Sequence, residues 1–395
     1  MKKILIIGAG NIGRGVVASL FYEAGYSITF YDAAAERMRN LSKRGHYLVV
    51  KYTDNGQEQM EINHFSVIDT EDHQTLEKSI AETDLIACCV YPGAFESVCR
   101  HIASAICMKA ASKSTSAFNV LLCTNTLHTP KIFHQYLERS LDGNGSALDY
   151  LRKQTGLSQV LVSIGGMPSS SEILERDPFA VAANFIGGRL EINQDTFIGN
   201  IDVPKVSLLP KAETYLVRKL FVANMKHCMT AYMGAACGCD YLDECSKISE
   251  ISWASEAAFS EAERAVSLEY GFNSEEEDTW RLNALKRAQV LTHDPISRVA
   301  ANAVEKVSHQ NRFVGPALLC LKHHILPFEI ARGIAYIFLC AHEEKADSAE
   351  MNAFLSKNGI DAAIEKYCEL TEDDYVLAGL IKGHYLALIH AKLSK

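Results

Sequence analysis

An apolar run, Ile4-Leu5-Ile6-Ile7, passes directly into Gly8-Ala9-Gly10-Asn11-Ile12-Gly13, and a helix-like segment follows from Asn11 to Glu23. This strand, glycine turn and helix form the context in which a GxGxxG motif binds a dinucleotide. The first glycine permits the tight turn, the second lets the backbone approach a pyrophosphate, and the third lets helix and strand pack closely. The N–H groups and dipole of the helix face the anion. A glycine turn that binds nothing is the simpler alternative.

An acidic residue ends the next predicted strand, Ser27–Tyr31, at the position where ribose hydroxyls are bound. The Asp32 carboxylate can accept hydrogen bonds from the adenosine ribose and would repel a 2′-phosphate, which favours NAD over NADP. Arg37 is close enough in sequence to leave tolerance of NADP open. We expect Gly8, Gly10, Asn11, Ile12, Gly13 and Asp32 to bind the cofactor, together with Thr124 and Asn125, which follow a later strand.

Short apolar runs alternate with longer amphipathic ones through the first half of the chain, a βαβ pattern typical of a parallel sheet covered by helices. The predicted strands are Ile4–Ile7, Ser27–Tyr31, Leu85–Val90, Val120–Cys123 and Gln159–Ser163. From Lys211 onward the sequence has helical periodicity, for example over Ile251–Leu268. We expect an α/β Rossmann-type NAD-binding domain with a parallel sheet over residues 1–205, and a mostly α-helical substrate and catalytic domain over residues 206–395.

The composition excludes several classes of protein. The 395 residues are 48% hydrophobic and 22% charged, which is ordinary for a folded globular chain. The net charge of −9 comes without a long basic run, so nucleic acid is not an expected partner. The 12 cysteines are spread through apolar stretches, which indicates reduced thiols. Because the sequence contains neither an export signal nor a span for a membrane, we expect a cytoplasmic protein.

A helix predicted over Glu213–Cys239 carries three polar side chains that can do chemistry: Lys219, Asn224 and His227. At about 100° per residue, His227 lies roughly 80° and Asn224 roughly 140° around the helix from Lys219. The three therefore share one broad side. Periodicity alone favours a plainer reading, in which Lys219 is solvated, Asn224 lies on the helix surface and His227 is a core histidine.

Two motifs, one in each half of the chain, make the sequence resemble the polyol-specific long-chain dehydrogenases, the mannitol dehydrogenase family. The first is Gly8-Ala9-Gly10-Asn11-Ile12-Gly13-Arg14-Gly15. The second is Lys219-Leu220-Phe221-(x2)-Asn224-(x2)-His227, followed by Thr230-Ala231-Tyr232. Weaker similarity runs through Arg298-Val299, Arg312, Pro316 and Arg332-Gly333-Ile334-Ala335, so the resemblance covers nearly the whole chain.

The resemblance implies metal-independent hydride transfer between NAD and a polyol or polyol phosphate, with mannitol 1-phosphate and fructose 6-phosphate as the expected pair. It also implies a chain that can act as a monomer. The family's catalytic Lys, Asn and His carry over onto Lys219, Asn224 and His227. A lysine base must lose its proton near neutrality, which burial and neighbouring charges can bring about. Asn224 and His227 would donate hydrogen bonds to the oxygen as it gains alkoxide character.

Several positions depart from the family pattern. Gly166-Met167 stands in place of an Asp-Arg pair, and Thr124-Asn125 in place of Glu-Asn. In place of Arg-x-Pro-x-Arg-Lys the chain has Ala301-Asn302-Ala303-Val304-Glu305-Lys306. A phosphate needs cationic or N–H donors, and Arg298, Lys306 and Arg312 are the remaining candidates for binding substrate. A paralogue acting on another polyol or sugar acid is the alternative.

Two readings from other classes remain. Cys237-Gly238-Cys239 with Cys245 and His227 can be drawn as a zinc cluster, but structural zinc sites use C-x2–4-C pairs. We therefore expect no metal. A catalytically silent NAD-binding regulator would retain the fold without turnover, and the departures at Gly166, Met167, Ala301, Ala303 and Glu305 motivate it. His323-His324 is expected to end a helix rather than to bind a ligand.

Overall fold

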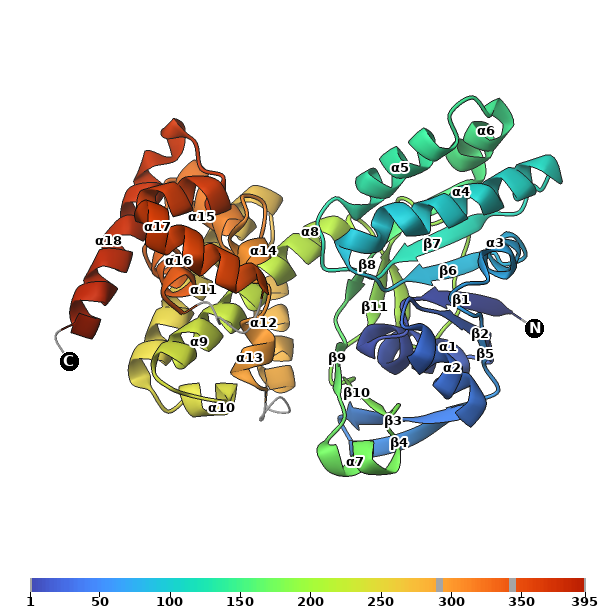
Figure 1. Cartoon of the computed structure of the whole chain (residues 1–395), viewed down its shortest axis with the longest axis horizontal. Coiled ribbons are helices and arrows are strands. Elements are labelled where there is room, and N and C mark those ends of the chain that lie inside the picture. Colours follow the sequence, from blue (N-terminus) through green and yellow to red (C-terminus); the bar gives the residue numbers. More distant parts are fainter. Residues whose placement is uncertain (1, 289–293, 341–345, 394–395) are drawn as a thin grey trace. The chain divides into compact units, whose positions relative to one another are not determined.

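The computed structural model describes residues 2–288, 294–340 and 346–393 (Figure 1). The chain divides into two compact units, Met1–Tyr215 and Leu216–Lys395. The division lies beyond the expected boundary at 205/206, because strand β12 (Val206–Leu209) pairs with β11 and extends the sheet of the first unit. Within the described ranges, no helix combines the length and the apolar character needed to cross a membrane.

The first unit is built on an eight-stranded sheet in the order β12-β11-β8-β7-β6-β1-β2-β5. From β8 to β5 all neighbouring strands are parallel, and β11 is antiparallel to β8. The strands are β1 (Lys3–Ile7), β2 (Ser27–Tyr31), β5 (Ser66–Val67), β6 (Leu85–Cys88), β7 (Phe118–Leu122), β8 (Thr155–Val162) and β11 (Leu190–Asn193). All five strands expected from the sequence are present, and the predicted Rossmann-type architecture is confirmed.

Helices cover both faces of this sheet (Figure 1). One face packs against α3 (His73–Ala81), α4 (Phe95–Ala111), α5 (Thr129–Ser140) and α6 (Gly145–Gln154). The other face packs against η1 (Gly13–Val17), α1 (Ala18–Glu23) and α2 (Ala35–Arg44). Strands β6 and β7 are buried along their whole length, as their apolar sequences predict. Strand β2 is buried only at alternate residues, which places it near the edge of the covered region.

A second, four-stranded sheet in the order β4-β3-β10-β9 was not expected from the sequence. It consists of β3 (His46–Thr53), β4 (Gly56–Asn63), β9 (Gly165–Pro168) and β10 (Val181–Asn184), with α7 (Ser171–Arg176) between the last two. Strand β4 is polar and mostly exposed, and β9 contains two glycines and a proline. Neither sequence shows the apolar alternation that identifies a strand.

The second unit is helical, as expected, and its core helices α9 (Met225–Ala236), α11 (Ser249–Tyr270) and α16 (Phe328–Cys340) pack on one another. The remaining elements are α8 (Ala212–Arg218), which spans the division, η3 (Lys219–Asn224), α10 (Leu242–Cys245), α12 (Ser274–Ala288), α13 (Ile296–Val299), α14 (Ala303–Val307), α15 (Val314–Lys322), α17 (Ala346–Cys368) and α18 (Tyr375–Leu393). Single 3-10 turns lie at Pro92–Ala94 (η2) and Glu372–Asp374 (η4). His323 is the C-cap of α15, which confirms its prediction as a helix end.

A partly exposed carboxylate, that of Glu77, links α3 to α4 in the first unit. Glu77 accepts hydrogen bonds from Ser104 Oγ (2.6 Å) and pairs with His101 Nδ1 (3.1 Å). Burial opposes the charged form, but these hydrogen bonds outweigh it and hold the pKa of Glu77 below its usual range. The stabilisation is therefore present above the unfolded pKa of about 4.3 and is lost as the pH falls through the lower folded value.

Replacing this carboxylate with an amide tests the pH dependence. We expect Glu77→Gln to lower the melting temperature of the first unit by about 2–4 °C at pH 6, because a hydrogen bond to a charged group is lost. The difference should shrink as the pH is lowered to 3, where wild-type Glu77 also becomes neutral. Glu138→Gln, which removes the exposed partner of His134, is the control and should shift the melting temperature by under about 1 °C. A Glu77 effect that does not change with pH would contradict the assignment.

Candidate active site

The glycine turn between β1 and the following helix has the geometry that a dinucleotide requires. Gly8 has a φ of +97°, and a Cβ on it would lie 2.4 Å from Cys89 O. A Cβ on Gly13 would lie 2.0 Å from Gly8 O, so this glycine lets the helix pack against the turn. A Cβ on Gly10 would meet nothing within 4 Å. The space beside Gly10 is therefore open to a ligand, whereas Gly8 and Gly13 must be glycines for the turn and helix to pack.

Asp32, at the carboxyl end of β2, joins the turn to the neighbouring loop. Its Oδ2 accepts a hydrogen bond from Ala9 N (2.7 Å), and its Oδ1 accepts one from Ala34 N (2.9 Å). A carboxylate has about four acceptor sites, so capacity remains for ribose hydroxyls. Arg37 lies exposed on α2.

Thr124 and Asn125 follow β7, whose carboxyl end lies at the same sheet edge as those of β1 and β6. Thr124 is buried, and its Oγ1 lies 3.1 Å from Thr129 Oγ1. Gln159 Nε2 donates to the carbonyl oxygen of Thr124. The Thr124 side chain therefore serves the fold of the loop, whereas Asn125 lies at the surface.

Arg14, six residues after Gly8, connects the nucleotide turn to the segment before β10. Its side chain is fully buried, Nε donates to Ala9 O (2.6 Å), and Nη1 donates to Phe179 O. Burial, with nearby Arg37, lowers its pKa to about 10. The sequence motif contained Arg14 but did not indicate this role, because its partner Phe179 is distant in sequence.

Both helices that carry candidate site residues contain a π-helical segment. In η1, Ala18 N donates to Gly13 O, and at the end of η3, Met225 N donates to Leu220 O, each a bond between residues five apart. Such segments are rare and occur frequently at functional sites. The π turn also brings residues five apart over one another, so Lys219 and Asn224 lie closer around the helix than α-helical spacing implied.

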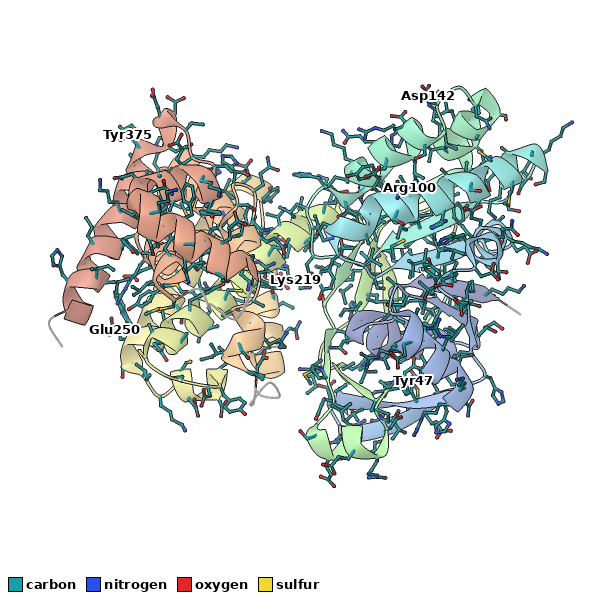
Figure 2. All side chains as sticks on the ribbon, viewed as in Figure 1. Tyr47, Arg100, Asp142, Lys219, Glu250 and Tyr375 are labelled. Carbon is teal, nitrogen blue, oxygen red and sulfur yellow. The ribbon has the colours of Figure 1, made fainter. Side chains whose placement is uncertain are left out.

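The three candidate catalytic side chains lie on the accessible face of η3 and α9. Lys219 (labelled in Figure 2), Asn224 and His227 are partly exposed. The residues between and beyond them on the other faces are buried: Leu220, Phe221, Val222, Met225, Cys228 and Met229. The His227 side chain is 38% exposed, so it is not a core histidine. The alternative prediction, that His227 is a core histidine, is therefore wrong.

Asp294 links two of the predicted site residues and was not found from the sequence. Its Oδ2 lies 3.2 Å from His227 Nε2, and its Oδ1 accepts a hydrogen bond from Arg298 Nε (2.6 Å). Arg298 Nη2 also donates to Oδ2. Burial disfavours the Asp294 carboxylate, but the hydrogen bonds from His227 and Arg298 outweigh it and hold its pKa below the usual range.

The other two predicted substrate cations, Lys306 and Arg312, have partners other than Asp294. Lys306 is only 5% exposed, and its Nζ donates to Val299 O (2.5 Å) and to Ala301 O. Burial lowers its pKa. Arg312 donates from Nε to Asn311 Oδ1 (3.2 Å) and lies 4.0 Å from Glu305. Each of the three cations, Arg298 included, already has a partner within the protein.

Comparison with known proteins places both units in one family. Residues 2–184 match the model of the mannitol dehydrogenase Rossmann domain, and residues 211–380 match that of the mannitol dehydrogenase C-terminal domain. The chain belongs to the mannitol dehydrogenase family. The resemblance seen in the two motifs is confirmed, and the chain is accordingly an oxidoreductase of the polyol dehydrogenase type.

Relatives in this family cover the chain almost completely. The chain is 27% identical over 386 residues to the mannitol-1-phosphate 5-dehydrogenase of Thermoanaerobacter pseudethanolicus, covering 97% of each. It is 26% identical over 395 residues to that of Bacillus pumilus, covering 96% of this chain and 99% of the relative.

Two solved structures share the fold. Pseudomonas fluorescens mannitol 2-dehydrogenase, in a ternary complex with NAD and D-mannitol, superposes with a TM-score of 0.76 at 15% identity and covers 100% of this chain and 94% of its own. A D-sorbitol dehydrogenase in substrate-free form gives a TM-score of 0.72 at 13% identity, covering 96% and 91%.

One departure from the mannitol dehydrogenase family pattern has a steric reason. Gly166 lies on β9 beside the start of the nucleotide-binding helix, and a Cβ there would lie 2.9 Å from Ile12 Cδ1 and 3.0 Å from the Asn11 backbone. A larger residue would require the end of the Ile12 side chain to move and the Asn11 backbone to shift by a few tenths of an ångström. Nothing in the structure explains Met167.

The cysteines that suggested zinc lie near one another without forming a metal cluster. In the described part of the chain, no group of three His, Cys, Asp or Glu side chains is arranged to hold a metal ion. Cys245 is buried beside Gly234, where an added Cβ would lie 2.3 Å from its Sγ. Burial, with Cys239 close by, raises the pKa of the Cys245 thiol to about 12, so it is protonated at neutral pH.

Proposed function

We propose that this chain is an NAD-dependent, metal-independent dehydrogenase that interconverts mannitol 1-phosphate and fructose 6-phosphate. The observation that carries the proposal is the shared partial exposure of Lys219, Asn224 and His227 on one side of η3 and α9, whose apolar residues on the other side are buried. The mannitol-1-phosphate 5-dehydrogenases among the relatives support the substrate pair. In this proposal the first unit binds NAD and the second supplies the catalytic side chains.

The cofactor proposal depends on the nucleotide turn and Asp32. The open space at Gly10 admits a pyrophosphate, and the Asp32 carboxylate accepts the ribose hydroxyls while repelling a 2′-phosphate. The Pseudomonas fluorescens relative of the same fold binds NAD. When bound, NAD accepts the hydride that leaves the polyol carbon.

The side chains perform the proton and charge chemistry of the reaction. Lys219 Nζ takes the proton of the reacting hydroxyl during oxidation and returns it during reduction. Asn224 donates a hydrogen bond from its amide to the oxygen as negative charge develops, and His227 lies next to it on the same face. In this proposal the Asn224 amide stabilises the developing charge without a metal.

A second candidate substrate class is an unphosphorylated polyol or sugar acid. It is favoured by the intramolecular contacts of Lys306 and Arg312, since a phosphate would have to displace or share their partners. The two candidate substrates differ only in a substituent that lies at a distance from the reacting carbon.

Parallel assays of NADH oxidation separate these candidates. With protein treated with EDTA, we expect turnover of fructose 6-phosphate with kcat/KM about 10²- to 10⁴-fold above that of fructose, the contribution of two charged hydrogen bonds to phosphate. Turnover of fructose, another ketose or a keto-sugar acid alone would establish the second candidate. Loss of activity in EDTA, restored by zinc, would contradict the metal-independent mechanism. NADH binding with no turnover of any sugar would indicate the silent regulator.

A further inference from the structure

The Asp294 carboxylate contacts two predicted site residues. Asp294 Oδ2 faces His227 Nε2 at 3.2 Å, while Oδ1 accepts from Arg298 Nε at 2.6 Å and Arg298 Nη2 completes a two-point contact. His227 lies on α9 and Arg298 on α13, so the contact joins two helices. We propose that Asp294 is a positioning residue of the active site, which sets the tautomer of His227 and the orientation of Arg298. This inference rests on the proposed function.

The burial of Asp294 and the hydrogen bonds of its backbone hold its carboxylate in a defined position. Its side chain is only 6% exposed, whereas those of His227 and Arg298 are 38% and 48% exposed. Its carbonyl oxygen accepts a hydrogen bond from Leu242 N (3.1 Å), and Ile296 N donates to Asp240 O (2.9 Å). The backbone at Asp294 and directly after it is therefore hydrogen-bonded to the segment at the start of α10, and the two more exposed partners contact a buried carboxylate.

The chemistry of the carboxylate decides which nitrogen of His227 meets the substrate. An ionised carboxylate only accepts hydrogen bonds, so Nε2 of His227 must carry the hydrogen that points to Asp294. Nδ1 is then the nitrogen left for a substrate. In the neutral ring Nδ1 accepts a hydrogen bond from a substrate hydroxyl, and it donates only when the ring is protonated. The role expected from the sequence, donation to the developing alkoxide, is thus restricted to the protonated ring.

The same carboxylate fixes the guanidinium plane of Arg298. A two-point contact uses Nε–H and one N–H of Nη2, and the other N–H groups of the guanidinium stay available. Because the side chain is half exposed, these groups can reach a hydroxyl or phosphate oxygen of a substrate. Asp294 thereby couples the reacting end of the proposed site to a group that binds the substrate.

The kinetic test is Asp294→Asn, which preserves size but cannot accept from both partners. We expect kcat for fructose 6-phosphate reduction to fall about 10- to 100-fold and KM for the sugar to rise, with NADH affinity unchanged. In a His227→Gln background, Asp294→Asn should lower kcat much less, because the tautomer it sets is absent. Equal further loss in that background would overturn the proposal, since it would indicate a structural role.

A matched control is available in the same unit. Glu269 also holds one histidine and one cation, His323 at 2.8 Å and Lys322 at 2.6 Å. We expect Glu269→Gln to leave kcat and KM within about twofold of wild type. If both variants reduce turnover to the same extent, the effect of Asp294 is not specific to the site.

A second readout does not depend on turnover. With 15N-labelled histidine, the ring nitrogens of His227, assigned by their loss in His227→Gln, should report a single Nε2–H tautomer in the wild-type protein and a mixture in Asp294→Asn. An unchanged tautomer in the variant would overturn the proposal. If the wild-type protein turns over no sugar but the tautomer changes, the proposed function fails while the positioning role of Asp294 stands.

Discussion

Lys219→Ala is expected to lower kcat by about 10²- to 10⁴-fold, the usual contribution of a general base. Because Lys219 is proposed to act on the reacting oxygen and not on the nucleotide, NADH affinity should stay within about twofold. The side chain is partly exposed, so its removal leaves no cavity in the core. Stopped-flow measurement of NADH oxidation, with NADH binding followed by fluorescence, checks both halves of the expectation.

Two further lysine variants distinguish proton transfer from charge. Lys219→Arg retains the positive charge but cannot lose its proton, so it should be nearly as inactive as the alanine variant. Lys226 lies on the same accessible side and pairs with Glu256, and Lys226→Ala should leave kcat within about twofold. Substantial activity in Lys219→Arg would exclude the lysine as a base. A parallel loss of NADH binding in Lys219→Ala would place its role at the cofactor.

Gly10→Ala is expected to raise the dissociation constant for NADH about 10- to 100-fold, which corresponds to losing one charged hydrogen bond to the pyrophosphate. The new Cβ would meet no protein atom within 4 Å, so the unliganded protein should keep its melting temperature. The loss would arise only because the methyl group occupies the space that the pyrophosphate approaches. Isothermal titration with NADH, together with thermal unfolding without ligand, measures the two effects separately.

Two other glycines serve as controls for this change. Gly145→Ala also adds a Cβ with nothing within 4 Å, at the start of α6, and should leave NADH affinity unchanged. Gly13→Ala should instead lower the melting temperature of the unliganded protein, because its Cβ would lie 2.0 Å from Gly8 O. Unaltered NADH binding by Gly10→Ala would show that the nucleotide does not use this turn.

Local patterns were sufficient for the strands at the centre of the sheet. The apolar runs at β1, β6 and β7 are buried on both faces. Such strands can be recognised from the local sequence, because every residue in the run is apolar. The polar strand β4 and the glycine-containing β9 could not be recognised in this way. Strand β4 forms a hairpin with β3, and β9 pairs with β10, which itself joins β3 in parallel from a distant part of the sequence.

The candidate site residues could be proposed from the sequence, but their contacts could not. Lys219, Asn224 and His227 were identified from a motif, and the structure places them on one partly exposed face. The pairing of Asp294 with Arg298 has the spacing of a helical ion pair, a signal that the sequence contained. The contact of the same carboxylate with His227 spans 67 residues and left no such signal.

By itself, the sequence determined the glycine turn, the alternation of strands and helices, and the helical character of the second unit. Each of these follows from short-range sterics and periodicity, which act between residues close along the chain. Only the tertiary structure decided the second sheet, the pairing of the three predicted substrate cations and the place of Asp294. These depend on segments that meet only after the chain has folded, where burial sets which polar groups must find partners.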